Sequence, residues 1–230
     1  MLQKYDFLIE LEAGSLILKT KKVLKPFSNR PKGRIFVGLK SMKTMEPDLQ
    51  SCIQILERGG LILYPTDTIW GIGCDATNAE AVARVYSLKR RADSKAMIVL
   101  LDSDDRLDHY VVDVPPIARD LLAVAVKPLT IVFEGAYNVA NQLLGENDSL
   151  GIRVSHEVFS QQLCARFGKP IVSTSANLSG EPSPATFADI SPEILNGVDY
   201  VVNYRRDDTS PHQASNIILL RSDGTFKLIR

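Results

Sequence analysis

The sequence predicts a mixed α/β (α+β) domain, in which an open sheet of parallel and antiparallel strands is flanked by helices. From Thr44 onward, short apolar runs alternate with stretches of helical period, the pattern of a sheet covered by helices. Late in the chain, two strand-like runs are joined by Ser222-Asp223-Gly224, which is a hairpin signal. This hairpin argues against a purely parallel sheet.

Four segments combine the apolar spacing of amphipathic helices with recognisable end signals. They are residues 47–58, 78–90, 116–125 and 156–167. Pro47 is suited to the first turn of its helix. Asn78 is suited to an N-cap. Gly168 provides a stop for the last helix.

Several short runs rich in Val, Ile, Leu, Tyr and Phe are bounded by turn residues and are predicted to be strands. In chain order they are residues 61–64, 97–101, 129–133, 150–154, 171–173, 200–203, 216–220 and 225–229. Residues 177–184 are rich in Ser, Gly and Pro, which predicts a loop. Residues 205–214 form a second predicted loop, long and polar enough to act as a lid.

The first part of the chain differs from the rest in charge. No acidic residue lies between Glu12 and Glu46, whereas nine residues there are Lys or Arg. We therefore predict a basic arm or extension over residues 1–43 and the main domain over residues 44–230. The arm is either a solvated leader or a nucleic-acid contact.

Within the arm, residues 7–11, 16–18 and 35–39 are candidate short strands. A further possibility is that translation begins at Met42 or Met45.

Composition excludes several classes of protein. The formal net charge is +0, so the overall charge names no partner. Cys52, Cys74 and Cys164 are odd in number and unpatterned, which argues against a disulfide framework and favours a reducing compartment. No apolar run reaches the ~18 residues of a membrane span, and the charged N-terminal residues do not resemble a signal peptide. We expect a cytoplasmic protein without membrane association.

Two segments change abruptly from apolar to polar, and they carry the main functional signal. Residues 61–76 (LILYPTDTIWGIGCDA) and 170–180 (PIVSTSANLSG) each begin as a buried-type strand and continue with hydroxyl and amide side chains. Ligands bind at such strand ends in open α/β sheets, so we expect both segments to line one pocket. Between them, Lys89, Arg91 and Lys95 form a cationic cluster suited to phosphate. Helix ends also favour cations, and turns favour Ser and Asn, so these residues alone leave phosphate binding open.

Other common site motifs are absent or lie in the wrong context. The G-x-G-x-x-A pattern at residues 71–76 is separated from the preceding strand by residues 66–70, which excludes a dinucleotide-binding turn. The pattern G-x-x-x-x-G-K-[ST] does not occur. His109, His156 and His212 lie in ordinary polar contexts, and no spacing of His, Cys, Asp and Glu predicts a metal site.

Several separated motifs occur in one order, and together they resemble the YrdC-like family of threonylcarbamoyl-adenylate synthases. The motifs are YPTDTIWGIGCDA at residues 64–76, K-x-R at 89–91 with Lys95 behind it, GIRV at 151–154 and STSANLSG at 173–180. The resemblance runs from about Pro47 to Arg230. It implies an open, twisted mixed sheet flanked by helices around a cationic cavity, as in YrdC/RibB-like folds.

The resemblance also implies an activity. Such enzymes are nucleotidyltransferases that join L-threonine, bicarbonate and ATP into L-threonylcarbamoyladenylate and release pyrophosphate. Other proteins then transfer the threonylcarbamoyl group to an adenosine of tRNA. Mg2+ would be held mainly by the ATP phosphates, which agrees with the missing metal cluster. Cations and hydroxyls without a histidine base suit charge stabilisation at phosphate.

Site residues follow from the same resemblance. The implied catalytic residues are Lys89, Arg91, Ser175 and Asn177. The implied ATP-binding residues are Lys89, Arg91, Lys95, Ser173, Ser175, Asn177, Ser215 and Arg230. The implied threonine-binding residues are Thr66, Thr130 and Arg153, and Arg153 also matches a position on the nucleotide side of the family's cavity.

Two alternatives remain at this stage. The first is a non-catalytic protein of the same fold that binds double-stranded RNA or tRNA through its backbone. Ser175 and Asn177 argue against it, because backbone binding does not need them. The second is carbamoyl-adenylate chemistry that starts from carbamoyl phosphate, as in hydrogenase maturation, where the module occurs among additional domains.

Overall fold

The computed structural model describes residues 6–12, 15–21, 39–91, 97–210, 212 and 214–230, with side chains described from Thr44 onward. Contacts divide the chain into two compact units, Met1–Val37 and Gly38–Arg230, and each is described by itself. The predicted division between residues 43 and 44 stays a prediction.

The first unit contains an antiparallel hairpin of β1 (Asp6–Glu12) and β2 (Ser15–Lys21). It confirms the strands predicted at residues 7–11 and 16–18. The strand predicted at residues 35–39 falls outside the described residues except for Leu39, which is helical.

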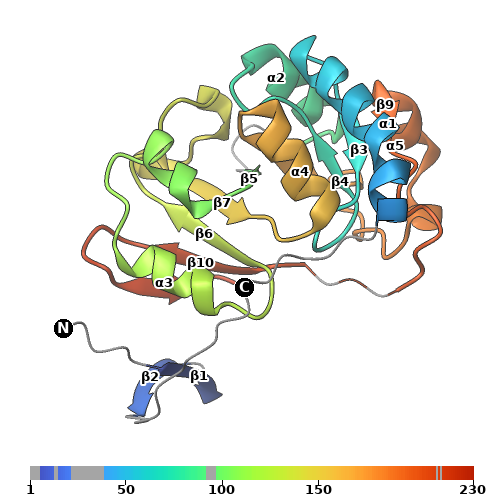
Figure 1. Cartoon of the computed structure of the whole chain (residues 1–230). Coiled ribbons are helices and arrows are strands. Elements are labelled where there is room, and N and C mark those ends of the chain that lie inside the picture. The colour runs from blue at the N-terminus through green and yellow to red at the C-terminus, as the bar shows by residue number, and fades with distance from the viewer. Residues whose placement is uncertain (1–5, 13–14, 22–38, 92–96, 211, 213) are drawn as a thin grey trace. The chain divides into compact units, whose positions relative to one another are not determined.

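The described strands of the second unit form one nine-stranded sheet with the order β11-β10-β6-β7-β5-β8-β4-β3-β9 (Figure 1). In chain order they are β3 (Ile62–Tyr64), β4 (Gly71–Gly73), β5 (Ile98–Leu101), β6 (Leu129–Phe133), β7 (Leu150–Val154), β8 (Ile171–Ser175), β9 (Tyr200–Val201), β10 (Asn216–Leu220) and β11 (Phe226–Leu228). Three neighbouring pairs are parallel, namely β6–β10, β5–β7 and β3–β9, and the others are antiparallel. The mixed sheet and the late hairpin are therefore confirmed.

All four predicted helices are present, together with one short helix and several 3-10 turns that were not predicted. The α-helices are α1 (Leu39–Glu57), α2 (Ala79–Leu88), α3 (Ile117–Val124), α4 (Val158–Phe167) and α5 (Pro192–Gly197). The 3-10 turns are η1 (Asp104–His109), η2 (Asn141–Leu143), η3 (Glu146–Asp148) and η4 (Phe187–Asp189). Asn78 caps α2 by accepting from the N–H groups of Glu80 and Ala81, both at 3.0 Å. Gly168 ends α4 in the left-handed region, with φ of 75°.

One predicted helix boundary is wrong. Helix α1 begins at Leu39 rather than at Pro47, and the proline lies inside it. A proline removes one backbone donor from a helix interior, but here the residues on either side keep the helical backbone.

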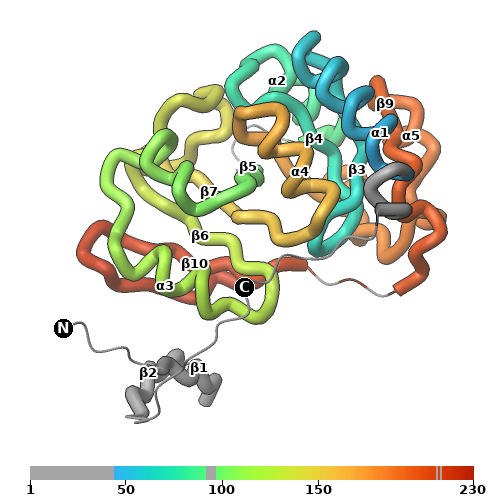
Figure 2. The backbone as a smooth tube through the Cα atoms, viewed as in Figure 1, coloured from blue at the N-terminus to red at the C-terminus, as the bar shows by residue number. Residues whose placement is uncertain are grey.

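Helices α1 and α4 pack against each other and against the sheet (Figure 1). Helix α1 contacts β3 and β9, and α4 contacts β5. Both bury their predicted apolar stripes, as shown by Leu49 and Leu56 of α1 and Phe159 and Leu163 of α4. At the other end of the sheet, β10 pairs with β6 and β11 pairs with β10 as the edge strand, so the last residues of the chain lie beside β10 (Figure 2).

Strand β4 was not predicted, because Gly-Ile-Gly lacks the apolar run of a typical strand. It pairs with β3 and β8, so the two glycines lie in a strand and do not open a helix. This confirms that the motif at residues 71–76 is not a dinucleotide-binding turn. A Cβ on Gly73 would lie 2.7 Å from the Tyr64 ring, so close packing explains this glycine.

Candidate active site

A cavity of about 200 Å³ is bordered by residues of β4, β5, β7, β8 and β10 and by the segment after α2. Its polar wall includes six residues that the sequence predicted for the site: Arg91, Arg153, Ser173, Ser175, Ser215 and Arg230. Apolar side chains of Trp70, Met97, Ile98 and Ile217 complete it. A few convergent polar groups among apolar neighbours are typical of a small-molecule site.

The two polar strand ends meet in this cavity, as their sequences predicted. Gly71 of β4 pairs with Ser175 of β8, and Ser173 of β8 pairs with Ile98 of β5. The register therefore places the turn after β3 and the polar end of β8 at one wall, although they are far apart in sequence.

Arg91 reaches the cavity through a sharp turn at the end of α2. Its neighbour Arg90 has φ of 50°, a left-handed conformation that a non-glycine residue rarely adopts. The Arg90 side chain points to the surface and pairs with Glu193 at 2.8 Å. The turn therefore separates two adjacent arginines, and only Arg91 lines the cavity.

Lys89 is buried, with 1% of its surface exposed, and does not line the cavity. Its ammonium donates to the carbonyl of Ser175 and, at 2.6 Å, to the carbonyl of Asn177. The Lys89 carbonyl in turn accepts from the Ser179 N–H at 2.8 Å. Lys89 thus ties the end of α2 to the polar loop that follows β8.

Burial, and secondarily the charge of Arg91, lowers the pKa of Lys89 to about 8. The two carbonyls that accept from its ammonium act in the opposite direction. The charge of Lys89 is therefore sensitive to mildly alkaline pH.

Asn177 is held by its own loop. Its Nδ2 donates to the carbonyls of Leu178 at 2.9 Å and Glu181 at 2.7 Å. Its Oδ1 is buried without a hydrogen-bond partner among the described residues. Asn177 does not line the cavity, so the predicted contact of this residue with ATP stays a prediction.

Ser215 and Arg230 come together beside β10. The Ser215 and Thr130 hydroxyls form a hydrogen bond of 2.8 Å, with Thr130 fully buried behind Ser215. The Arg230 guanidinium donates to the Ser215 carbonyl at 3.3 Å. The Arg230 backbone also pairs with Ile217, at 2.9 and 3.2 Å. The arginine that we predicted at the nucleotide side is thus anchored at the cavity.

Thr66 occupies a different position from the other predicted residues. Its hydroxyl accepts from the Thr68 N–H at 3.1 Å and donates to the Ile69 carbonyl at 2.8 Å, which fixes the turn after β3. Thr66 lines a smaller adjacent cavity with Arg205 and His212. Its contact with threonine stays a prediction.

Sequence reasoning missed several residues around the site. Arg205 of the predicted lid segment donates to the Thr66 carbonyl at 3.2 Å and pairs with Asp208 at 2.7 Å. Asp67 pairs with Arg153 at 3.1 Å. Arg205 and Asp67 lie in segments that the sequence analysis singled out, but no spacing pattern predicted the contacts that they make. Lys95 lies outside the described residues.

No group of three or more His, Cys, Asp and Glu side chains in the described part of the chain could hold a metal ion. No helix of that part is long and apolar enough to cross a membrane.

Comparisons with known proteins show the family of this chain. The Sua5/YciO/YrdC family, described as "Telomere recombination", matches residues 54–230. A threonylcarbamoyl-AMP synthase of Xanthomonas euvesicatoria pv. vesicatoria is 38% identical over 159 residues, covering 68% of this chain and 85% of the relative. One of Xanthomonas campestris pv. campestris is 34% identical over 161 residues, covering 68% and 86%.

Two solved structures share the fold. P. abyssi Sua5 complexed with L-threonine has a TM-score of 0.71 at 23% identity, covering 80% of this chain and 54% of that one. E. coli YciO has a TM-score of 0.68 at 22% identity, covering 80% and 89%. The chain thus spans about half the length of the P. abyssi protein. The family match, the close relatives and the fold agree, and the chain belongs to the Sua5/YciO/YrdC family.

Proposed function

We propose that this chain is a nucleotidyltransferase that makes L-threonylcarbamoyladenylate from L-threonine, bicarbonate and ATP, with release of pyrophosphate. The observation that carries the proposal is one cavity that is lined by Arg91, Arg153 and four serines. Two guanidinium groups can hold a phosphate chain and a carboxylate at once. The names of the curated relatives support the same reaction.

The reaction needs positioned charge more than a nucleophilic side chain. The neutral threonine amine adds its electron pair to the carbon of CO2 and loses a proton to solvent, or adds to bicarbonate with loss of water, and either route gives a carbamate. A carbamate oxygen then attacks the α-phosphorus, the bond to the bridging oxygen breaks, and pyrophosphate leaves with the electron pair. Negative charge shifts onto the leaving group in this step, where fixed cations lower the barrier.

We assign Arg91, Ser173, Ser175, Ser215 and Arg230 to ATP because they line the cavity. Lys89 and Asn177 act mainly by holding the loop that carries Ser175. Lys95 keeps its proposed place beside the phosphates on the family resemblance alone.

Arg153 is the cavity residue that we assign to threonine, whereas Thr66 and Thr130 keep their place in the threonine site on the family resemblance alone. Arg153 supplies the guanidinium for the threonine carboxylate. Thr66 shapes the turn beside it, and Thr130 supports Ser215 from behind.

Magnesium would enter as the MgATP complex. The described residues offer no protein-built site for it, and Mg2+ is commonly held by substrate phosphates and water. When bound, it would neutralise part of the phosphate charge.

The pKa of Lys89 predicts a pH dependence. As the pH rises through about 8, Lys89 loses its charge, and kcat/KM for ATP is expected to fall by up to about tenfold per pH unit. Stability should change in the opposite sense: between about 8 and the ordinary value of 10.5, the unfolded chain binds the proton more tightly than the native state, so stability rises. Initial rates and thermal melts from pH 6.5 to 9.5 test both trends. A flat activity profile would show that the Lys89 charge does not matter.

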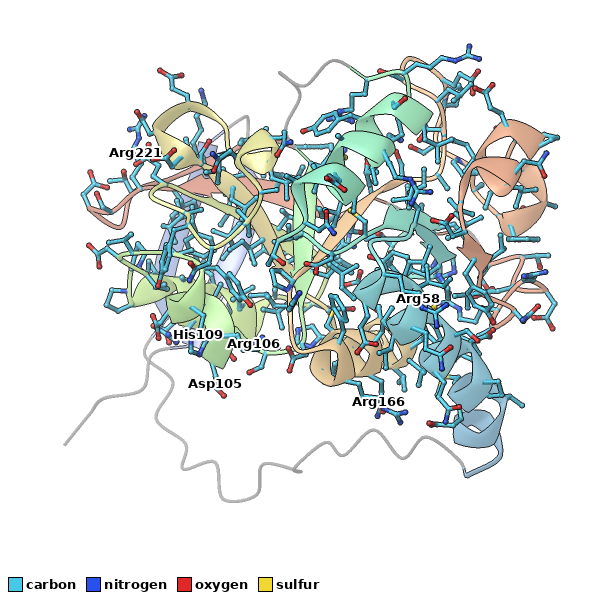
Figure 3. All side chains as sticks on the ribbon, turned by 90° about the horizontal axis from the view of Figure 1, so that it is seen from above. Arg58, Asp105, Arg106, His109, Arg166 and Arg221 are labelled. Atoms are coloured by element: carbon cyan, nitrogen blue, oxygen red, sulfur yellow. The ribbon has the colours of Figure 1, made fainter. Side chains whose placement is uncertain are left out.

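We also propose that tRNA receives the product group through downstream transfer proteins and that the reaction takes place in the cytoplasm on residues 44–230. The basic residues that suggested RNA contact lie between residues 19 and 43, where no side chains are described. In the second unit, Figure 3 shows Arg106, Arg166 and Arg221 on separate elements, and the first two pair with Asp102 and Glu46. These three arginines do not form one basic surface.

Pyrophosphate release tests the function. With MgATP and bicarbonate, release should depend on L-threonine, and L-serine should give a weaker response because it lacks the methyl group. Release that is indifferent to both amino acids would contradict the proposal.

A further inference from the structure

Arg153 and Asp67 form the most buried ion pair among the described residues. Their side chains are 3% and 10% exposed, and Arg153 Nη2 lies 3.1 Å from Asp67 Oδ1. Arg153 lies on the central strand β7, where it pairs with Leu100 of β5. Asp67 lies in the turn between β3 and β4, which the Thr66 hydroxyl fixes. Two rigid elements therefore bring these charges together.

The pair is incompletely satisfied. The contact between Nη2 and Oδ1 is close enough for an ion pair but lacks hydrogen-bond geometry, so Arg153 Nε and Asp67 Oδ1 are both buried without a hydrogen-bond partner among the described residues. Guanidinium groups have five donors, and a buried one normally uses most of them. Arg153 also lines the cavity, so an anionic ligand bound there would lie beside this residue.

Stability does not explain the pair. Burial raises the pKa of Asp67, and the opposing attraction of Arg153 is the smaller effect. Ionising this carboxyl therefore costs the fold free energy, as is common for buried ion pairs. A functional reason for the carboxylate is more consistent with this balance.

The charges around the cavity provide a functional reason for the Asp67 carboxylate. Arg153 shares it with Arg91 and Arg230, and ATP would bring several negative charges into it. An untethered guanidinium on a flexible stem would be drawn to the phosphates. The Asp67 carboxylate, 3.1 Å from Nη2, would oppose this movement and keep the planar fork oriented for a second, smaller anion.

We propose that Asp67 is a positioning residue that holds the Arg153 guanidinium for the carboxylate of the amino-acid substrate and away from the phosphates of ATP. This role rests on the proposed function for the identity of the substrates. It predicts that loss of the Asp67 charge weakens amino-acid binding and leaves nucleotide binding intact.

The test compares Asp67→Asn with Asp102→Asn, since Asp102 forms a half-buried pair with Arg106 at 3.2 Å outside the cavity. Calorimetry measures the Kd of L-threonine, and pyrophosphate release gives KM for each substrate. Asp67→Asn should raise Kd and KM for threonine by about 10- to 100-fold, as for a misplaced positioning group. KM for ATP should be unchanged or lower. Asp67→Glu restores the charge and should recover part of the affinity, whereas Asp102→Asn should match the wild type.

Two results would overturn the role of Asp67. One is an unchanged threonine Kd in Asp67→Asn. The other is an equal rise of both KM values with a lowered Tm, which would make Asp67 purely structural. Failure of the proposed function looks different, since wild-type protein would then bind threonine in the calorimeter with an Asp67-dependent Kd but release no pyrophosphate. Absence of any threonine binding by the wild type would contradict both.

Discussion

Replacing Arg91 by alanine is expected to lower kcat/KM for ATP by about 100- to 1000-fold, the usual effect of removing one charge-stabilising group from a transition state. Arg91 is the cavity residue that the turn at the end of α2 delivers. The fold should tolerate the change, because Arg91 is only partly buried and its substitution opens no core cavity. Steady-state kinetics with a thermal melt measure both effects.

Arg90→Ala is the matched control for this variant. Arg90 is the adjacent residue, shares the turn, and pairs with Glu193 at the surface with 68% of its side chain exposed. Loss of an exposed ion pair has little effect, so turnover should stay within about twofold of the wild type. Equal losses in the two variants would mean that the turn, and not the Arg91 guanidinium, is what the reaction needs.

Replacing Lys89 by methionine is expected to lower both stability and turnover. Methionine fills a similar volume but cannot donate to the carbonyls of Ser175 and Asn177. Leaving buried acceptors short of a partner costs about 1–3 kcal/mol, offset in part by removing a buried charge. The loop that carries Ser175 would lose its link to α2, so kcat should fall by about 100-fold, as for a shifted catalytic group.

Lys169→Met provides the comparison for Lys89. Lys169 forms an ion pair at 2.7 Å with the buried Asp75, but half of the Lys169 side chain is exposed and it does not line the cavity. Because the buried Asp75 carboxylate loses a partner, Lys169→Met should lower stability by about 1–3 kcal/mol but leave turnover unchanged. If Lys89→Met kept the wild-type Tm and lost only ATP affinity, Lys89 would contact the phosphates directly and would not act through the loop.

The parts of the fold that the sequence predicted are those with strong local signals. Strands β6, β7 and β10 have the predicted bounds because each is a short stretch rich in Leu, Ile, Val and Phe that is bounded by turn or polar residues. Strand β4 was not predicted because Gly73 is explained by close packing on Tyr64, and such a tertiary contact cannot be read from the local sequence. The start of α1 was misplaced because the proline signal was given more weight than the surrounding helical backbone.

For the site as well, some features could be predicted from the sequence and others could not. Residue types at strand ends predicted that Ser173 and Ser175 gather at the cavity, whereas Arg153 was expected there from the family resemblance. Their individual roles depend on where each atom points, which spacing does not encode. Lys89 and Arg91 are two residues apart in one motif, yet Lys89 is buried and does not line the cavity, whereas Arg91 does. Only the structure brings Asp67 next to Arg153.

Direct detection of the product tests the central claim. The protein would be incubated with MgATP, L-threonine and 13C-bicarbonate. The nucleotides would then be separated by chromatography and their masses measured by mass spectrometry. We predict an adenylate that contains threonine and one labelled carbon, requires all three substrates and forms in equal amount with pyrophosphate. ATP binding without any labelled adenylate would contradict the account and would favour an RNA-binding protein of the same fold.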